Sequence, residues 1–142
     1  MGERYFRSTV VGMLGRVLLL RGRPEDAEAF VVLAEALSDA DDAWSQVLWR
    51  STRARLVAEA FPLRGLELAG QAVDLAATTT DLALRGDTLS DLAEVLAVTG
   101  SPAESRVMLK RALSLYERKG DTTSAGRCRS RLDELDAGVP VD

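Results

Sequence analysis

Arginine and carboxylate side chains are the residues of this sequence whose types and spacing could do chemistry. Its 142 residues include no histidine, so zinc sites and imidazole acid–base catalysis lack their usual residue. The single cysteine, Cys128, cannot form a disulfide within the chain, and it shares an apolar helical stripe with Ala125 and Leu132, which indicates packing. Neither a G-x-S-x-G motif nor a phosphate-binding glycine loop occurs. We therefore predict that the protein is not an enzyme, binds no metal and uses no cofactor.

The densest arginine cluster could hold an anionic ligand or a phosphate group. It consists of Arg50, Arg53 and Arg55, and Arg16 and Gln46 are further candidates for such a site. The alternative is that these arginines are solvated or paired with some of the 22 acidic residues. Both interpretations stay open at the level of sequence.

Three other patterns favour an ordinary structural interpretation. The segment "SDADD" (38–42) lacks the central glycine and distal glutamate of a calcium-binding loop, so we expect Asp41 or Asp42 to cap a helix there. The basic run "RCRSR" (127–131) has no interleaved aromatic residues, and the net charge of −4 argues against a nucleic-acid partner. Trp44 and Trp49 lie on different helix faces, and we expect Trp49 in the core and Trp44 half-exposed.

Three prolines at a nearly constant interval divide the chain into similar units. Pro24, Pro62 and Pro102 are 38 and 40 residues apart, and small or apolar residues follow each one at the spacing of a single helix stripe. These residues are Ala27, Val31, Ala34, Leu37, Gly65, Ala69, Ala72, Leu75, Ser105, Leu109, Ala112 and Leu115. A matching stripe precedes the first and third prolines, so each unit is predicted to be a helix hairpin.

Glycine and proline predict the turn inside the first and third hairpins. Gly22 and Gly100 end one helix in the left-handed conformation, and Pro24 and Pro102 begin the next, where the missing N–H costs nothing. The seven predicted helices span 3–21, 24–38, 41–60, 63–77, 81–99, 102–118 and 122–136. Hairpins at 3–38, 41–77 and 81–118, followed by a capping helix at 122–136, would form one all-α domain over residues 1–142.

The residues expected where two helices cross are small. They are Gly15 and Ala93 on the first helices, and Ala27, Gly65 and Ser105 on the second. This layout resembles the tetratricopeptide repeat, although the period exceeds that family's usual length of about 34 residues and Arg53 takes a small-residue position. The resemblance implies an α-solenoid, a superhelix of three helix hairpins plus a C-terminal capping helix. It also implies a non-catalytic scaffold for protein–protein interaction, with a concave groove that binds a protein or peptide.

A more particular resemblance concerns three longer stretches. "DDAWSQVLWRSTRARLVA" (41–58), "LRGDTLSDLAEVLAVTG" (84–100) and "ALSLYERKGD" (112–121) are similar to the helical-repeat tails of large multidomain bacterial signalling proteins. Those proteins carry nucleotide-cyclase-like or LuxR-type modules and an ATPase core. The resemblance implies a cytoplasmic, regulatory role in signalling or transcription, and a chain that is a fragment of a longer protein.

The inner sides of the first helices supply the candidates for the partner-binding groove. They are Arg16, Leu19, Val47, Arg50, Ala54, Val57, Ser90, Glu94 and Ala97. We expect Arg16 and Arg50 at equivalent levels of repeats one and two, with Asp87 and Glu94 on that side of repeat three, so the groove would run from positive to negative. Its occupant would be a segment of a protein partner, or of other domains of the same polypeptide.

The first predicted helix is apolar on more than one face, as Tyr5, Phe6, Val10 and Met13 illustrate. Such a surface is expected to meet a preceding repeat or to form a homodimer, and the alternative function is therefore self-association through this helix. The apolar run 10–20 is interrupted by Arg16 and is too short to span a membrane. No small-residue cleavage site follows it, so we expect a cytoplasmic segment and no membrane partner.

Overall fold

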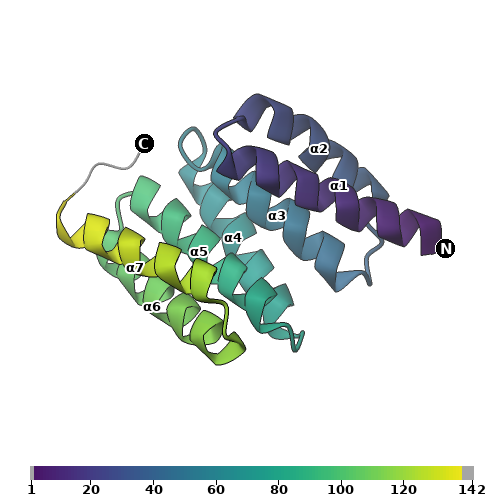
Figure 1. Cartoon of the computed structure of the whole chain (residues 1–142). Coiled ribbons are helices and arrows are strands. Elements are labelled where there is room, and N and C mark those ends of the chain that lie inside the picture. Colours follow the sequence, from purple (N-terminus) through teal and green to yellow (C-terminus); the bar gives the residue numbers. More distant parts are fainter. Residues whose placement is uncertain (1, 139–142) are drawn as a thin grey trace.

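A computed structural model describes residues 2–138 and places them in seven α-helices with no β-strand (Figure 1). The helices are α1 (Gly2–Leu20), α2 (Pro24–Leu37), α3 (Ala43–Val57), α4 (Pro62–Ala77), α5 (Leu82–Val98), α6 (Pro102–Lys119) and α7 (Thr122–Asp136). The predicted all-α array of three hairpins and a capping helix is confirmed, with each helix end within three residues of its expected position. The hairpins α1–α2, α3–α4 and α5–α6 follow one another in space in chain order, and α7 packs on α6 (Figure 1).

Two alternating start signals set the helix boundaries. Asp42, Asp81 and Asp121 are the N-caps of α3, α5 and α7, and each carboxylate accepts a hydrogen bond from the main-chain N–H three residues later. The second helices α2, α4 and α6 instead begin with proline. The acidic segment 38–42 is therefore a helix start, as expected from its sequence.

Glycines with positive φ make the sharp turns between helices. Gly22 and Gly100 have φ values of 74° and 90°, and the residue after each donates its N–H back to the preceding helix, at 2.9 Å for Arg23 and 2.8 Å for Ser101. The predicted turn chemistry of the first and third hairpins is confirmed. The second hairpin has no glycine at its turn, and Phe61 precedes Pro62 there.

The hairpins cross through small residues. Ala93 is fully buried, and the Ser105 hydroxyl donates to the Ala93 carbonyl oxygen at 2.7 Å, which confirms the predicted crossing of α5 and α6. In the second hairpin a Cβ added at Gly65 would lie 2.9 Å from the Ala58 backbone. Arg53, at the expected small-residue position, does not take part in this crossing: it is half-buried over the Trp49 ring and pairs with Glu35 of α2.

The two ends of the array differ in how they cover their apolar residues. At the C-terminal end, Cys128 and Leu135 of α7 are buried on a cluster that includes Leu109 of α6. At the N-terminal end, one face of α1 is left open, with Phe6 69% exposed and Met13 51% exposed. Trp49 is buried and Trp44 is half-buried, as predicted.

Candidate partner-binding surface

One buried carboxylate connects the first helices of all three hairpins. Asp91 of α5 is 1% exposed and accepts hydrogen bonds from Arg16 of α1, from the Ser51 hydroxyl of α3 at 2.7 Å, and from Arg55 of α3 at 3.3 Å. Arg16 and Asp91 are 75 positions apart in the sequence. Because a buried carboxylate needs compensating charge and hydrogen bonds, these partners hold α1, α3 and α5 in one arrangement.

The charge of Arg16 is committed to this contact. Burial by itself lowers the pKa of the Arg16 guanidinium. The nearby carboxylates of Asp91 and Asp87 raise that pKa by a larger amount, so the net shift is upward. The group therefore stays cationic and is compensated by carboxylates of this chain. Arg16 supports the surface and contributes little free charge to it.

A tyrosine–carboxylate pair lies beside this network. The Tyr116 hydroxyl of α6 donates to Asp87 of α5 at 2.5 Å, and Gly86 makes room for the ring, since a Cβ there would lie 2.7 Å from it. Burial raises the pKa of Asp87, and Arg16 and the Tyr116 hydrogen bond oppose that rise without cancelling it. Burial, followed by the neighbouring Asp87 carboxylate, raises the pKa of Tyr116. The phenol is therefore a hydrogen-bond donor at neutral pH.

Helix α7 adds two arginines to this surface, Arg131, which forms an ion pair with α5, and Arg127, which does not. Arg131 grips both carboxylate oxygens of Glu94, at 2.8 and 3.2 Å, and so ties α7 to α5. Arg127 is exposed and donates to the Ser124 hydroxyl at 3.0 Å, but within residues 2–138 it forms no ion pair. Burial raises the pKa of Cys128, which keeps the thiol protonated beside Ser90 and fits a packing role.

These groups enclose an open cavity of about 200 Å³, which we call the inner cavity. Its charged and polar wall comes from Arg16, Arg55, Asp87, Ser90, Glu94, Arg127 and Arg131, and Leu20 and Leu109 supply apolar surface. Sites for whole small molecules usually measure about 300–1,000 Å³, so this volume suits one or two side chains of a larger partner. Among residues 2–138 no cluster of carboxylate or thiol ligands fits a metal ion.

Three of the predicted groove residues meet in the inner cavity, namely Arg16, Ser90 and Glu94. Leu19 lines an adjacent cavity of about 260 Å³ that also contains Glu94. Val57 and Ala97 are half-buried and pack against the core. The predicted groove residues of α1 and α5 therefore include four that line these two cavities, whereas none of those predicted on α3 does.

Two predicted groove residues on α3 are wrong. Val47 is 1% exposed and Ala54 is fully buried, so neither offers surface to a partner. The physical reason is that α3 is the central first helix, packed against α1, α2, α4 and α5. Its inward residues are covered by neighbouring helices.

Arg50 is also placed differently from the prediction. Its guanidinium lies 4.3 Å from the centroid of the Trp49 ring and donates to Gln46 and to Gln71 of α4, away from the inner cavity. Counted back from the repeat prolines, Arg16 is equivalent to Ala54 and Glu94, and Arg50 is not equivalent to it. The expected charge gradient is therefore wrong, because Arg16 and Glu94 are each paired within the chain.

Sequence reasoning missed the centre of this surface. Asp91 was not a candidate, although an aspartate inside the apolar run of α5 is a signal for a buried partner. Tyr116, Arg127 and Arg131 were likewise not assigned to the groove. Tyr116 and Asp87 are 29 positions apart and Arg131 and Glu94 are 37 apart, and only the packed array brings them together.

Comparison with known families gives one match. A model of the tetratricopeptide repeat matches residues 10–32, which include the end of α1, the Gly22 turn and the start of α2. No curated protein and no solved structure matches the chain. Within residues 2–138, none of the helices combines the length and the apolar character needed to cross a membrane.

Proposed function

We propose that this protein is a non-catalytic interaction module whose inner cavity binds a segment of a protein partner. Tetratricopeptide repeats generally mediate protein–protein interaction, and the match at residues 10–32 supports that class of function. The observation that carries the proposal is the fixed arrangement of α1, α3 and α5 around Asp91, which leaves a preformed open cavity beside it. A rigid cavity binds a flexible segment with a smaller entropy loss on the protein side.

The groups left unpaired at the cavity suggest how it would hold a peptide. Asp87 uses one oxygen for Tyr116, and within residues 2–138 its second oxygen accepts no hydrogen bond. Arg127 presents guanidinium N–H groups without a carboxylate partner in the same range. A peptide group carries one donor and one acceptor, so an extended segment can donate to Asp87 and accept from Arg127. Leu20, which is exposed, would contact an adjacent apolar side chain.

A selection experiment tests this function. Peptides selected on the purified protein from a random phage-displayed library are measured for binding by fluorescence anisotropy. Arg127→Glu is expected to weaken the selected peptides about tenfold, because it reverses a charge that the partner contacts. Arg118→Glu is the matched control, since Arg118 is exposed at the end of α6 and does not line the inner cavity. Equal binding by both variants would place the partner elsewhere on the protein.

The regulatory setting is a finer part of the same proposal. It rests on the similarity of residues 41–58, 84–100 and 112–121 to the repeat tails of bacterial signalling and transcription proteins. In that setting the protein would be cytoplasmic, and its partner could be another domain of the same polypeptide. The reading frame that encodes the chain tests this proposal. Cyclase-like or LuxR-type modules in the same frame would support it, and a frame without either would count against it.

A second candidate function is self-association through α1. The open face of this helix supports it, with Phe6, Met13 and Val17 all exposed. A contiguous apolar surface of this kind favours association with a second apolar surface. Light scattering at increasing concentration tests it. A dimer that Phe6→Asp dissociates is expected if the candidate is right, and a wild-type monomer at every concentration would remove it.

A further inference from the structure

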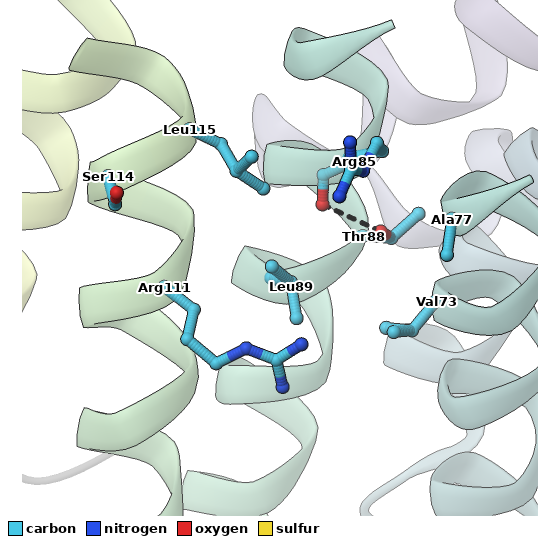
Figure 2. Close-up of a pocket in the computed structure, with 8 residues that line it drawn as sticks. All are labelled: Val73, Ala77, Arg85, Thr88, Leu89, Arg111, Ser114 and Leu115. Atoms are coloured by element: carbon cyan, nitrogen blue, oxygen red, sulfur yellow. Dashed lines mark hydrogen bonds between the residues drawn. The ribbon is translucent and has the colours of Figure 1, made fainter. Parts of the chain in front are cut away.

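Another cavity, drawn in Figure 2, lies on the opposite side of α5 from the inner cavity. Its volume is about 230 Å³, and it lies between α4, α5 and α6. Helix α5 presents Arg85, Thr88 and Leu89 to it, whereas Asp87 and Asp91 face the inner cavity. At about 100° of rotation per residue these two sets fall on opposite sides of the helix. We call this second site the outer cavity.

The floor of the outer cavity is apolar and its polar groups are few. Val73 and Ala77 of α4 line it together with Leu89 and Leu115 (Figure 2). The Thr88 hydroxyl is already used, because it donates to the Arg85 carbonyl oxygen at 2.9 Å. A ligand therefore meets apolar carbon at the bottom of this cavity.

Two arginines without a carboxylate partner flank that floor. Figure 2 shows the Arg85 and Arg111 side chains on either side of Leu89, with Arg111 extending from α6 toward α4. Within residues 2–138 neither forms an ion pair, and the guanidinium of Arg111 donates only to the Met108 sulfur, at 3.5 Å. Ion pairs are common elsewhere in this acidic chain, so two unpaired guanidinium groups at one apolar cavity leave a positive site without its counter-charge.

We propose that the outer cavity binds a carboxylate side chain of a partner peptide, with a neighbouring apolar residue seated on its floor. Guanidinium groups match a planar carboxylate with charge-assisted hydrogen bonds, and the apolar floor strengthens those bonds by excluding water. A phosphate dianion fits less well, because its greater charge would be desolvated with only two guanidinium groups and the exposed Ser114 hydroxyl as donors. This site is separate from the inner cavity, so its failure leaves the proposed function standing.

Nuclear magnetic resonance titration with two blocked peptides tests the site. The probes are acetyl-Leu-Glu-Leu-amide and acetyl-Leu-Gln-Leu-amide, which differ only in the charge of the central side chain. The glutamate peptide is expected to shift the methyl signals of Val73, Leu89 and Leu115. The glutamine peptide is expected to bind about tenfold more weakly, because it lacks the charge-assisted hydrogen bonds to Arg85 and Arg111.

Variants and a second anion make the result decisive. Arg85→Gln and Arg111→Gln are each expected to weaken the glutamate peptide about fivefold, since each removes one guanidinium. Arg118→Gln is the control on the same helix as Arg111, and binding should not change. The proposal is overturned if both peptides bind equally, if the shifts fall on Asp87 and Ser90 of the inner cavity, or if inorganic phosphate binds this cavity more tightly than the glutamate peptide.

Discussion

The two sides of α5 use arginine in opposite ways. On the inner side, Arg16 and Arg55 are half-buried and share the carboxylate of Asp91. On the outer side, Arg85 and Arg111 flank an apolar floor with no carboxylate partner among residues 2–138. An arginine paired within the chain fixes the position of helices, whereas an arginine left unpaired beside apolar surface is available to a ligand. Only the charged side chains that have no ion-pair partner within the chain therefore contribute to the charge that a cavity offers a ligand.

The largest expected effect comes from breaking the inner network. Asp91→Asn removes the charge that compensates Arg16, and a buried charge that loses its partner destabilises the fold by about 3–5 kcal/mol. Urea unfolding measures this loss. Arg85→Gln on the outer side is the control, and its midpoint should remain close to that of the wild type. A small effect of Asp91→Asn would mean that solvent, and not Asp91, compensates the charge of Arg16.

A smaller effect is expected from Gly86→Ala, because Gly86 of α5 lies against the Tyr116 ring at the inner cavity. An added Cβ would lie 2.7 Å from the Tyr116 ring and would displace the hydroxyl from Asp87. Overpacking of this kind usually costs about 1–3 kcal/mol. Gly126→Ala in α7 is the matched control, because nothing lies within 4 Å of the Cβ it adds. Equal unfolding midpoints for the two variants would contradict the account of the Tyr116 pocket.

The pH dependence of stability is expected to be modest and to have a definite sign. The pKa of Asp87 is raised above its ordinary value of 3.8, mainly by burial, so the folded protein binds this proton more tightly than the unfolded chain does. The contribution of Asp87 to stability is therefore present below its unfolded pKa and is lost as pH rises through its folded pKa. The free energy of unfolding of wild type minus that of Asp87→Asn should fall as pH increases from 3.8. A difference that grew with pH would contradict the raised pKa.

The smallest expected effect is on the outer side. Arg111 is exposed and has no ion pair within residues 2–138, so Arg111→Gln should change the free energy of unfolding by less than about 0.5 kcal/mol. Thermal unfolding followed by circular dichroism measures this change. A much larger loss would show that Arg111 supports the packing of α6, and the contrast between the two sides of α5 would then weaken.

Local signals account for the parts of the fold that sequence predicted. Gly22 and Pro24 act within one turn of the chain, and Asp42 caps α3 through an N–H three residues away. Contacts this short depend on neighbouring residue types alone. The helix boundaries and the hairpin order could therefore be predicted from the sequence.

The candidate site was harder to predict because its contacts are distant in sequence. Arg16 and Asp91 lie 75 positions apart, and no local pattern states that they pair. Arg50 was expected on the inner side of its helix at the level of Arg16, although the two are not equivalent when the repeats are aligned on proline. The predictions that Val47 and Ala54 line the groove were wrong because both are buried by the packing of α3 against four neighbouring helices, which the local sequence does not reveal.

A double-mutant cycle on Arg16 and Asp91 tests the central claim, that the inner arginines are structural because they are paired. Urea unfolding is measured for Asp91→Asn, Arg16→Met and the double variant, with Asp91→Asn combined with Arg85→Gln as the comparison pair. Adding Arg16→Met is expected to recover stability lost in Asp91→Asn, because it removes the uncompensated guanidinium. Adding Arg85→Gln should recover none. Purely additive losses for the two single variants would show that Arg16 and Asp91 do not act as a pair.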